Sequence, residues 1–118
     1  MTIDLIRKRI YHIDENRNLK EHFAFCTNFS HFEILNDGRV LVMENYYGYE
    51  NLGNSNLYCI NQNLEIEWFV QPEKKGERID QFVGFTTKGN KIYANTWDCF
   101  RMELNIENGT IVNKEFTK

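Results

Sequence analysis

The chain has few of the residues that mark several protein classes. It contains one proline and three cysteines among 118 residues, and no stretch approaches the ~20 apolar residues of a membrane span. Because Cys26, Cys59 and Cys99 are odd in number and far apart, we interpret them as buried thiols of a reducing compartment and not as a disulfide scaffold. The start, Met1–Arg9, has no apolar core behind its charges, unlike a secretory signal. We therefore expect one small cytoplasmic domain without membrane contact.

Positive charge is absent from the middle of the chain. No Lys or Arg occurs between Arg39 and Lys74, while the span carries five acidic residues: Glu44, Glu50, Glu65, Glu67 and Glu73. The net charge of the whole chain is −3, so a mildly acidic protein contains one strongly acidic third. Nucleic-acid binding depends on Lys and Arg that neutralise phosphates, and we expect no nucleic-acid partner. An acidic surface favours a basic protein partner instead.

Motifs that carry catalytic chemistry are also missing. His12, His22 and His31 show no spacing typical of a metal site, and no glycine-rich phosphate loop is present. Ser30 and His31 are adjacent, and adjacent strand residues point to opposite faces, so they cannot act as nucleophile and base. We expect His12 and His22 to lie opposite each other across one hairpin, which leaves a two-histidine nuclease as a weak alternative. We predict a binding protein that is not an enzyme and holds no metal.

What the chain does contain is a repeat. Each of three stretches combines a short strand with apolar alternation, a turn opened by Asp or Asn, and a second strand. They cover residues 9–23, 57–69 and 101–116. The turn residues Asp14, Asn61 and Asn105 are separated by 47 and 44 positions. A period of this size with strand content throughout is typical of β-propeller blades.

Each later repeat extends backwards into a second hairpin. Asp37-Gly38 and Gly89-Asn90 form tight turns, because residues that adopt positive φ easily suit the twist of a hairpin. The full units therefore have four antiparallel strands, and the first hairpin supplies only the last two strands of a unit. We predict an all-β fold, a partial propeller of about two and a half blades in one domain. Its parts are a half blade (1–31), a blade (32–70), a linker (71–81) and a blade (82–118).

The second unit resembles a known blade repeat. Tyr58-Cys-Ile-Asn61 followed by Leu64-Glu-Ile-Glu-Trp68 is similar to the repeat of PQQ-type β-propellers, in which a strand, a turn and a tryptophan recur in each blade. Trp97-Asp98 resembles the Trp-Asp dipeptide of WD-like propeller repeats, in a different strand position. The resemblance implies the fold unit alone, because the family's cofactor site needs a closed ring of blades and this chain is too short for one. We expect no cofactor.

Apolar alternation also predicts the core and the edges of this fold. Charged residues discourage unwanted pairing at the edge strands of an incomplete ring, and we interpret 6–10 and 114–118 as such edges. The side chains expected between the blades are Ile10, Ile34, Val40, Val42, Ile60, Trp68, Phe82, Phe85, Ile92 and Leu104.

The longest loop lies in the acidic third, at Glu44–Asn56, where the next unit has only Asn95–Asp98. Its three tyrosines among Gly, Asn and Ser resemble an antibody contact loop, with large rings for contact area and small polar residues for adaptable hydrogen bonds. A loop whose tyrosines fold back on the sheet is the alternative, as is a Trp97 packed between blades beside a turn-capping Asp98. We predict a partner-binding site at Glu44, Tyr46, Tyr47, Tyr49, Glu50, Trp97 and Asp98.

The overall layout is similar to that of half-propeller immunity proteins of contact-dependent growth inhibition. This resemblance implies a bacterial antitoxin that covers the basic active-site cleft of a cognate nuclease toxin domain, a ribonuclease in the first instance. Glu44, Glu50 and Asp98 would stand in for RNA phosphates, and the aromatic residues would be buried anchors. The alternative is a non-enzymatic propeller fragment that forms a homodimer or completes a larger assembly.

Overall fold

The computed structural model describes residues 1–51, 53–71, 73–75 and 78–117. Within these ranges the chain forms thirteen strands and no helix, which confirms the prediction of an all-β fold. Consequently, none of the described segments is a helix of the length and apolarity needed to cross a membrane.

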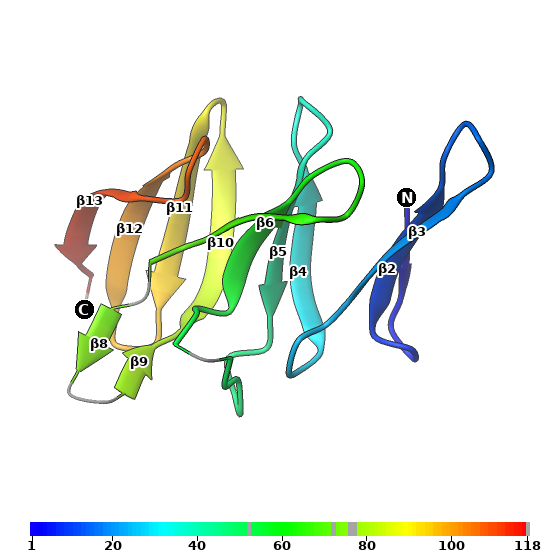
Figure 1. Cartoon of the computed structure of the whole chain (residues 1–118). Helices are drawn as coiled ribbons and strands as arrows, with labels where there is room; N and C mark the ends of the chain where they lie inside the picture. The colour runs from blue at the N-terminus through cyan, green and yellow to red at the C-terminus, as the bar shows by residue number, and fades with distance from the viewer. Residues whose placement is uncertain (52, 72, 76–77, 118) are drawn as a thin grey trace.

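Three sheets and one hairpin contain these strands, and within each of them consecutive strands pair antiparallel. The first sheet consists of β1 (Thr2–Asp4), β2 (Arg9–Ile13) and β3 (Leu19–Phe23). The second consists of β4 (Phe29–Ile34), β5 (Val40–Glu44), β6 (Leu57–Ile60) and β7 (Ile66–Phe69). The hairpin of β8 (Glu73–Lys75) and β9 (Arg78–Asp80) precedes the third sheet of β10 (Phe82–Lys88), β11 (Lys91–Thr96), β12 (Phe100–Asn105) and β13 (Ile111–Phe116). Figure 1 shows the three sheets side by side in chain order, with the termini at opposite ends.

The repeated turn residues make the same hydrogen bond in each sheet. The side-chain Oδ1 of Asp14, Asn61 and Asn105 accepts the backbone N–H two residues further along the chain, at 2.8–2.9 Å. A short Asp or Asn side chain can replace a backbone acceptor in this way and so fixes a tight turn. The sequence repeat therefore corresponds to one local structure formed three times.

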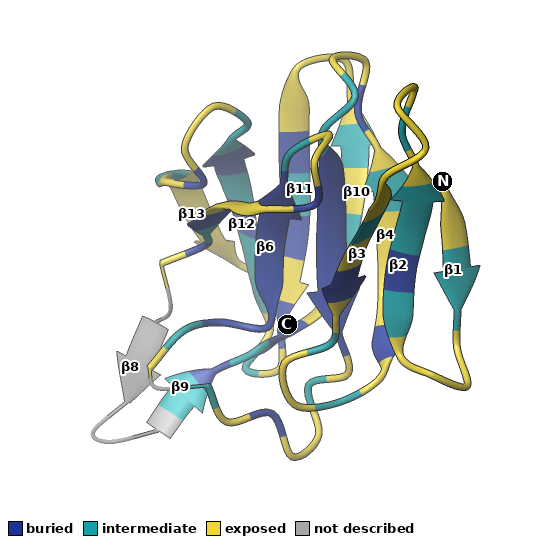
Figure 2. Ribbon diagram, turned by 45° about the vertical axis from the view of Figure 1, so that its right-hand side comes forward, coloured by how far each residue is buried: buried dark blue, intermediate teal, exposed yellow. Residues whose placement is uncertain are grey.

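The two central strands of the second sheet, β5 and β6, are buried on both faces. Along β5, Val40 and Val42 pack in a cluster with the first sheet, whereas Leu41 and Met43 pack in a cluster with the third. Successive side chains of a strand point to opposite faces, so an uninterrupted apolar run suits a strand covered on both sides. Figure 2 shows the resulting pattern, in which β6 is buried along its length and the outer strands carry exposed positions.

The contact between the second and third sheets includes a tryptophan over a glycine. Trp68 on β7 is buried, and its ring lies so close to Gly109 that a Cβ at this position would collide with it. Gly109 also has φ +74°, a conformation that favours glycine. The tryptophan that carries the blade resemblance therefore packs against the last turn of the next sheet.

The first sheet has one strand more than predicted. β1 pairs with β2, giving three strands where the sequence suggested two. A strand over residues 6–10 is wrong, because residues 5–8 form the turn before β2. Asp4 accepts the backbone N–H of Arg7 at 3.1 Å and Lys8 has φ +55°, and both features stabilise a turn. Residues 71–81, expected as a linker, contain β8 and β9. At the other predicted edge β13 ends at Phe116, and residue 118 lies outside the described part.

Most of the predicted core is correct, and the errors are local. Eight of the ten residues are buried: Ile10, Val40, Val42, Ile60, Trp68, Phe82, Ile92 and Leu104. Ile34 is wrong, because its side chain is 53 % exposed while the adjacent Leu35 is buried. Phe85 is half-buried and packs against the edge of the core. Ile34 and Leu35 are neighbours at the end of an edge strand, where one position of register decides which side chain faces inwards.

The three cysteines do not share one environment. Cys59 is buried, and burial raises the pKa of its thiol to about 11. Cys26 and Cys99 are exposed, so the interpretation of buried thiols is wrong for both. Cys26 follows β3 and Cys99 lies in the turn between β11 and β12, and connections of this kind run over the protein surface.

Candidate functional site

The long loop between β5 and β6 begins at a buried carboxylate. Glu44 is 0 % exposed. Its two oxygens accept four hydrogen bonds at 2.6–3.1 Å, from the backbone N–H groups of Phe25, Cys26 and Thr27 and from the hydroxyl of Tyr58. Residues 25–27 connect β3 to β4, so this carboxylate fastens the connection between the first two sheets to the second sheet.

Two of the predicted contact residues are therefore not on the surface. The prediction that Glu44 mimics a phosphate is wrong, because its side chain is fully buried and serves as a structural anchor. Tyr49 is also buried, and its hydroxyl accepts a hydrogen bond from the Asn51 side chain at 3.0 Å. Burial raises the pKa of the Tyr49 hydroxyl. This tyrosine folds back on the sheet, as the alternative interpretation of the loop expected.

A histidine extends the Glu44 network into the first sheet. His22 on β3 is buried, and its Nε2 lies 2.7 Å from the Tyr58 hydroxyl. Because that hydroxyl donates its only proton to Glu44, Nε2 must carry a hydrogen and donate to Tyr58. Burial lowers the pKa of His22, and the nearby charge of Glu44 opposes part of this effect.

The lowered pKa of His22 predicts a loss of stability in mild acid. The unfolded chain binds a proton below about pH 6.5, whereas the folded chain binds it only at lower pH. The free energy of unfolding should fall as the pH decreases from 6.5 towards the folded-state pKa, and urea denaturation at pH 7.5 and 5.5 would measure the fall. A His22→Gln variant keeps a donor for Tyr58 without titrating, so its fall should be smaller. An equal fall in both proteins would contradict the assignment.

The two histidines of the weak nuclease alternative do not form a pair. The register places His22 opposite Ile10 and His12 opposite Lys20, so the expectation that they face each other is wrong. His12 instead donates from Nε2 to the carbonyl of Gln62 at 2.8 Å. Among the described residues, no group of three or more His, Cys, Asp or Glu side chains could hold a metal ion.

The remaining aromatic residues of the prediction lie together. Tyr46 and Trp97 stack with ring centroids 5.1 Å apart and planes at 29°. Tyr47 is 82 % exposed and Trp97 is 56 % exposed. The three rings line a cleft of about 410 Å³ together with Gly48, Ile79, Asp80 and Gln81. Trp97 thus shares one surface with the tyrosines and is not packed between the sheets.

The cleft joins three segments that are distant in the sequence, and a hydrogen-bond network fixes them. The backbone N–H of Trp97 donates to the carbonyl of Gln81 at 3.0 Å, and the Gln81 side chain accepts the N–H of Asn56 at 3.0 Å. The Asn56 side chain pairs with both backbone groups of Phe82 at 2.8 Å. The loop from the second sheet and the turn of the third sheet are therefore held to the same short segment.

The two remaining predicted residues lie outside the residues that line the cleft. Glu50 is exposed, and its carbonyl accepts a hydrogen bond from the thiol of Cys26 at 2.7 Å. Asp98 is half-buried, and its backbone N–H donates to the Asp80 carboxylate at 3.1 Å. Their carboxylates are candidates for the rim of a contact surface, not for its centre.

The acidic third of the sequence does not form one patch. Glu65 and Glu67 are exposed but belong to the turn after β6 and to β7, at the end of the second sheet away from the loop at 45–56. Glu44 is buried, and the side chain of Glu73 lies outside the described part. Of the five glutamates, Glu50 is the one exposed on the loop itself.

Sequence reasoning missed the floor of the cleft. Ile79, Asp80 and Gln81 fall within residues 71–81, which the sequence predicts as a linker. Nothing in the spacing indicated that this segment would lie under the Tyr-rich loop.

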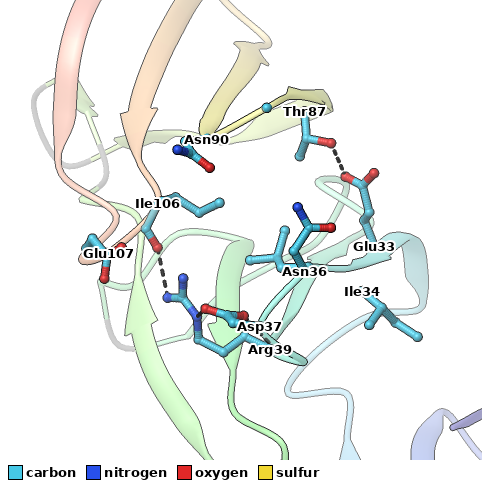
Figure 3. A pocket seen from close by; sticks show the side chains of 11 residues that line it. Glu33, Ile34, Asn36, Asp37, Arg39, Thr87, Asn90, Ile106 and Glu107 are labelled. Carbon is cyan, nitrogen blue, oxygen red and sulfur yellow. Dashed lines mark hydrogen bonds and ion pairs between the residues drawn. The ribbon is translucent and has the colours of Figure 1, made fainter.

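A second cleft lies between the second and third sheets, at the end opposite the aromatic cleft (Figure 3). It has a volume of about 450 Å³. Thr87 donates to Glu33 across it at 2.6 Å, and Arg39 donates to the carbonyl of Ile106 at 2.8 Å while pairing with Asp37 at 2.7 Å. The bonds of Thr87 and Arg39 tie the two sheets together, so we assign this cleft a structural role.

No protein-family model matches the chain, and no curated protein matches it either.

Proposed function

We propose that this protein is an immunity protein that binds and neutralises a cognate bacterial toxin domain. The observation that carries the proposal is the exposed aromatic cleft formed by Tyr46, Tyr47 and Trp97. Exposed Trp and Tyr residues on a fixed scaffold are typical of the residues that dominate binding energy at protein interfaces.

The toxin that suits this surface is a basic nuclease, with a ribonuclease as the first candidate. Tyr46, Tyr47 and Trp97 would be the anchors, and Glu50 and Asp98 would take positions that RNA phosphates occupy in the toxin's basic cleft. Inhibition would follow from occlusion of that cleft, without any catalytic step. The proposal also places the protein in the cytoplasm, where such a toxin would act.

The proposal also includes the arrangement of the sheets as a partial β-propeller. The three meandering sheets pack face to face in chain order, and two of them have four strands. This arrangement supports the proposal of a partial β-propeller, with the aromatic cleft on its rim.

The alternative, a homodimer that closes a ring, receives less support from the end faces of the array. On the first sheet, Arg9 pairs with Glu21 at 2.8 Å and covers the Tyr11 ring at 4.4 Å. On the third sheet, Arg101 covers the Tyr93 ring at 4.7 Å. A closed ring would bury both arginines, and desolvating such charges is costly. Polar outer faces are instead typical of repeats that cap an array.

The decisive experiment is titration calorimetry against the C-terminal domain encoded by the gene immediately upstream. Nanomolar binding that also abolishes the toxicity of that domain would support the immunity function. The absence of binding, together with a stable dimer by light scattering, would refute it in favour of self-association.

The exposed charge of Glu50 leads to a prediction about the association rate with the proposed toxin. Glu50→Lys should slow binding to the basic toxin by up to about tenfold at low ionic strength, because exposed rim charges act mainly through long-range attraction. The loss should shrink as salt is added, since salt screens exposed charges. Stopped-flow association rates at two salt concentrations would measure it.

Glu65→Lys is the matched control for this substitution. It makes the same change of charge at an exposed residue on the other end of the second sheet. It should slow association much less than Glu50→Lys. Equal slowing by both variants would mean that only net charge matters and that Glu50 is not at the rim.

A further inference from the structure

The aromatic cleft has one charged residue among the described residues that line it, and that charge is incompletely satisfied. Asp80 is 2 % exposed. One of its carboxylate oxygens, Oδ1, accepts the backbone N–H of Asp98 at 3.1 Å. The other, Oδ2, has no hydrogen-bond partner in the part of the chain that the structure describes.

A buried carboxylate oxygen without a partner is uncommon in folded proteins. Leaving a buried acceptor unsatisfied costs about 1–3 kcal/mol, and more when the group is charged. A group of this kind therefore calls for an explanation such as a bound ion or a ligand. Asp80 is one of the residues that line the cleft, so the cleft is the side from which a donor outside the protein would approach its carboxylate.

The other walls of the cleft suit a cation on an apolar stem. Tyr46, Tyr47 and Trp97 supply ring faces, and such faces attract cations within about 6 Å, with Trp the strongest. Ile79 supplies an aliphatic surface for methylene groups. A cleft with aromatic walls and a carboxylate favours a positively charged side chain over a neutral or acidic one.

Between the two cationic side chains, the geometry favours arginine. Its guanidinium is planar, stacks on aromatic rings and presents five donors, whereas the lysine ammonium is a strongly hydrated point charge. The stacked pair of Tyr46 and Trp97 already presents flat ring surfaces at the cleft, and the Asp80 carboxylate can accept from a guanidinium N–H.

We propose that the cleft lined by Tyr46, Trp97 and Asp80 is a receptor site for one arginine side chain of the protein partner. The identity of that partner rests on the proposed immunity function, but the chemistry of the site does not. The arginine stem lies against Ile79 and the rings, and its guanidinium points towards the Asp80 carboxylate.

The test uses the isolated protein and a small probe, so it does not depend on any toxin. N-acetyl-arginine methylamide is titrated into the ¹⁵N-labelled protein while the indole N–H signals of Trp97 and Trp68 are followed. The Trp97 signal should shift with a millimolar dissociation constant, and that of the buried Trp68 should not. N-acetyl-citrulline methylamide, which has the same shape without the charge, should bind at least tenfold more weakly.

Asp80→Asn is the matched variant, because it removes the charge and keeps an oxygen for the Asp98 N–H. It should weaken binding of the arginine probe at least tenfold and leave citrulline binding unchanged. If this variant fails to fold, Trp97→Leu removes a ring face in an exposed position and should give a similar loss. Equal binding of both probes, or an unchanged affinity in a folded variant, would overturn the proposal.

Failure of this site and failure of the immunity function have different signatures. Arginine-probe binding without toxin binding would refute the immunity function and leave the receptor site in place. Toxin binding that is insensitive to Asp80→Asn, with no response to the probe, would refute the receptor site alone.

Discussion

Replacement of Glu44 by alanine is expected to lower the free energy of unfolding by about 3–5 kcal/mol, because it breaks a hydrogen-bond network around a buried carboxylate. The substitution leaves three backbone N–H groups of residues 25–27 and the Tyr58 hydroxyl without their acceptor. A buried group left unsatisfied costs about 1–3 kcal/mol, which applies in full to the Tyr58 hydroxyl and in part to the partly buried N–H groups. Because small domains are stable by only about 5–15 kcal/mol, this one change should remove a large share of the total.

Urea denaturation of Glu44→Ala and of Glu50→Ala would measure this effect against a control. Glu50 is exposed on the same loop, and surface substitutions of this kind change stability by about 0.5 kcal/mol or less. Glu44→Gln keeps one acceptor and should fall between the two. A loss below about 1 kcal/mol for Glu44→Ala would mean that water replaces the carboxylate and that the site is not closed.

The second large effect is expected in binding. Trp97→Ala should weaken the complex with the toxin domain by more than about 2 kcal/mol, the range of dominant interface residues. This corresponds to more than about thirtyfold in the dissociation constant, and it should appear mainly in the dissociation rate. The fold should survive, because Trp97 is exposed and its backbone N–H keeps its bond to Gln81.

Phe23→Ala provides the comparison for Trp97→Ala. Phe23 is an exposed ring on the first sheet and does not line the cleft. Calorimetry should therefore give nearly the wild-type affinity for this variant. A similar loss from both substitutions would indicate that exposed aromatic area in general drives binding, or that the interface lies elsewhere.

Local signals were sufficient to predict most of the strands, although β1, β8 and β9 were not among them. The turns at Asp14, Asn61 and Asn105 could be read because an Asp or Asn side chain fixes a turn through its own neighbours. The alternation of β11 likewise indicated a buried Ile92. Such information is contained within a few residues, so one sequence is enough to reveal it.

The burial of Glu44 and Tyr49 could not be predicted in the same way. A glutamate at the start of a Tyr-rich loop is usually a surface residue, since carboxylates are rarely buried without partners. The partners at 25–27 come from a connection 17–19 residues earlier, and no spacing rule links the two segments. Asp80 was missed for the same reason, because its role depends on which loops fold over it.

The side-chain amide of Asn56 has a consequence for affinity. By pairing with both backbone groups of Phe82, it imitates one step of a β-ladder and sets the spacing between two sheets. Tyr46 comes from one of these sheets and Trp97 from the other, so the width of the aromatic cleft is determined when the protein folds. The proposed partner would then meet rings that are already arranged, so that little conformational entropy would be lost on association. The contact between the two sheets therefore fixes the geometry of the proposed binding surface, and substitutions at this contact, outside the cleft, can change the affinity.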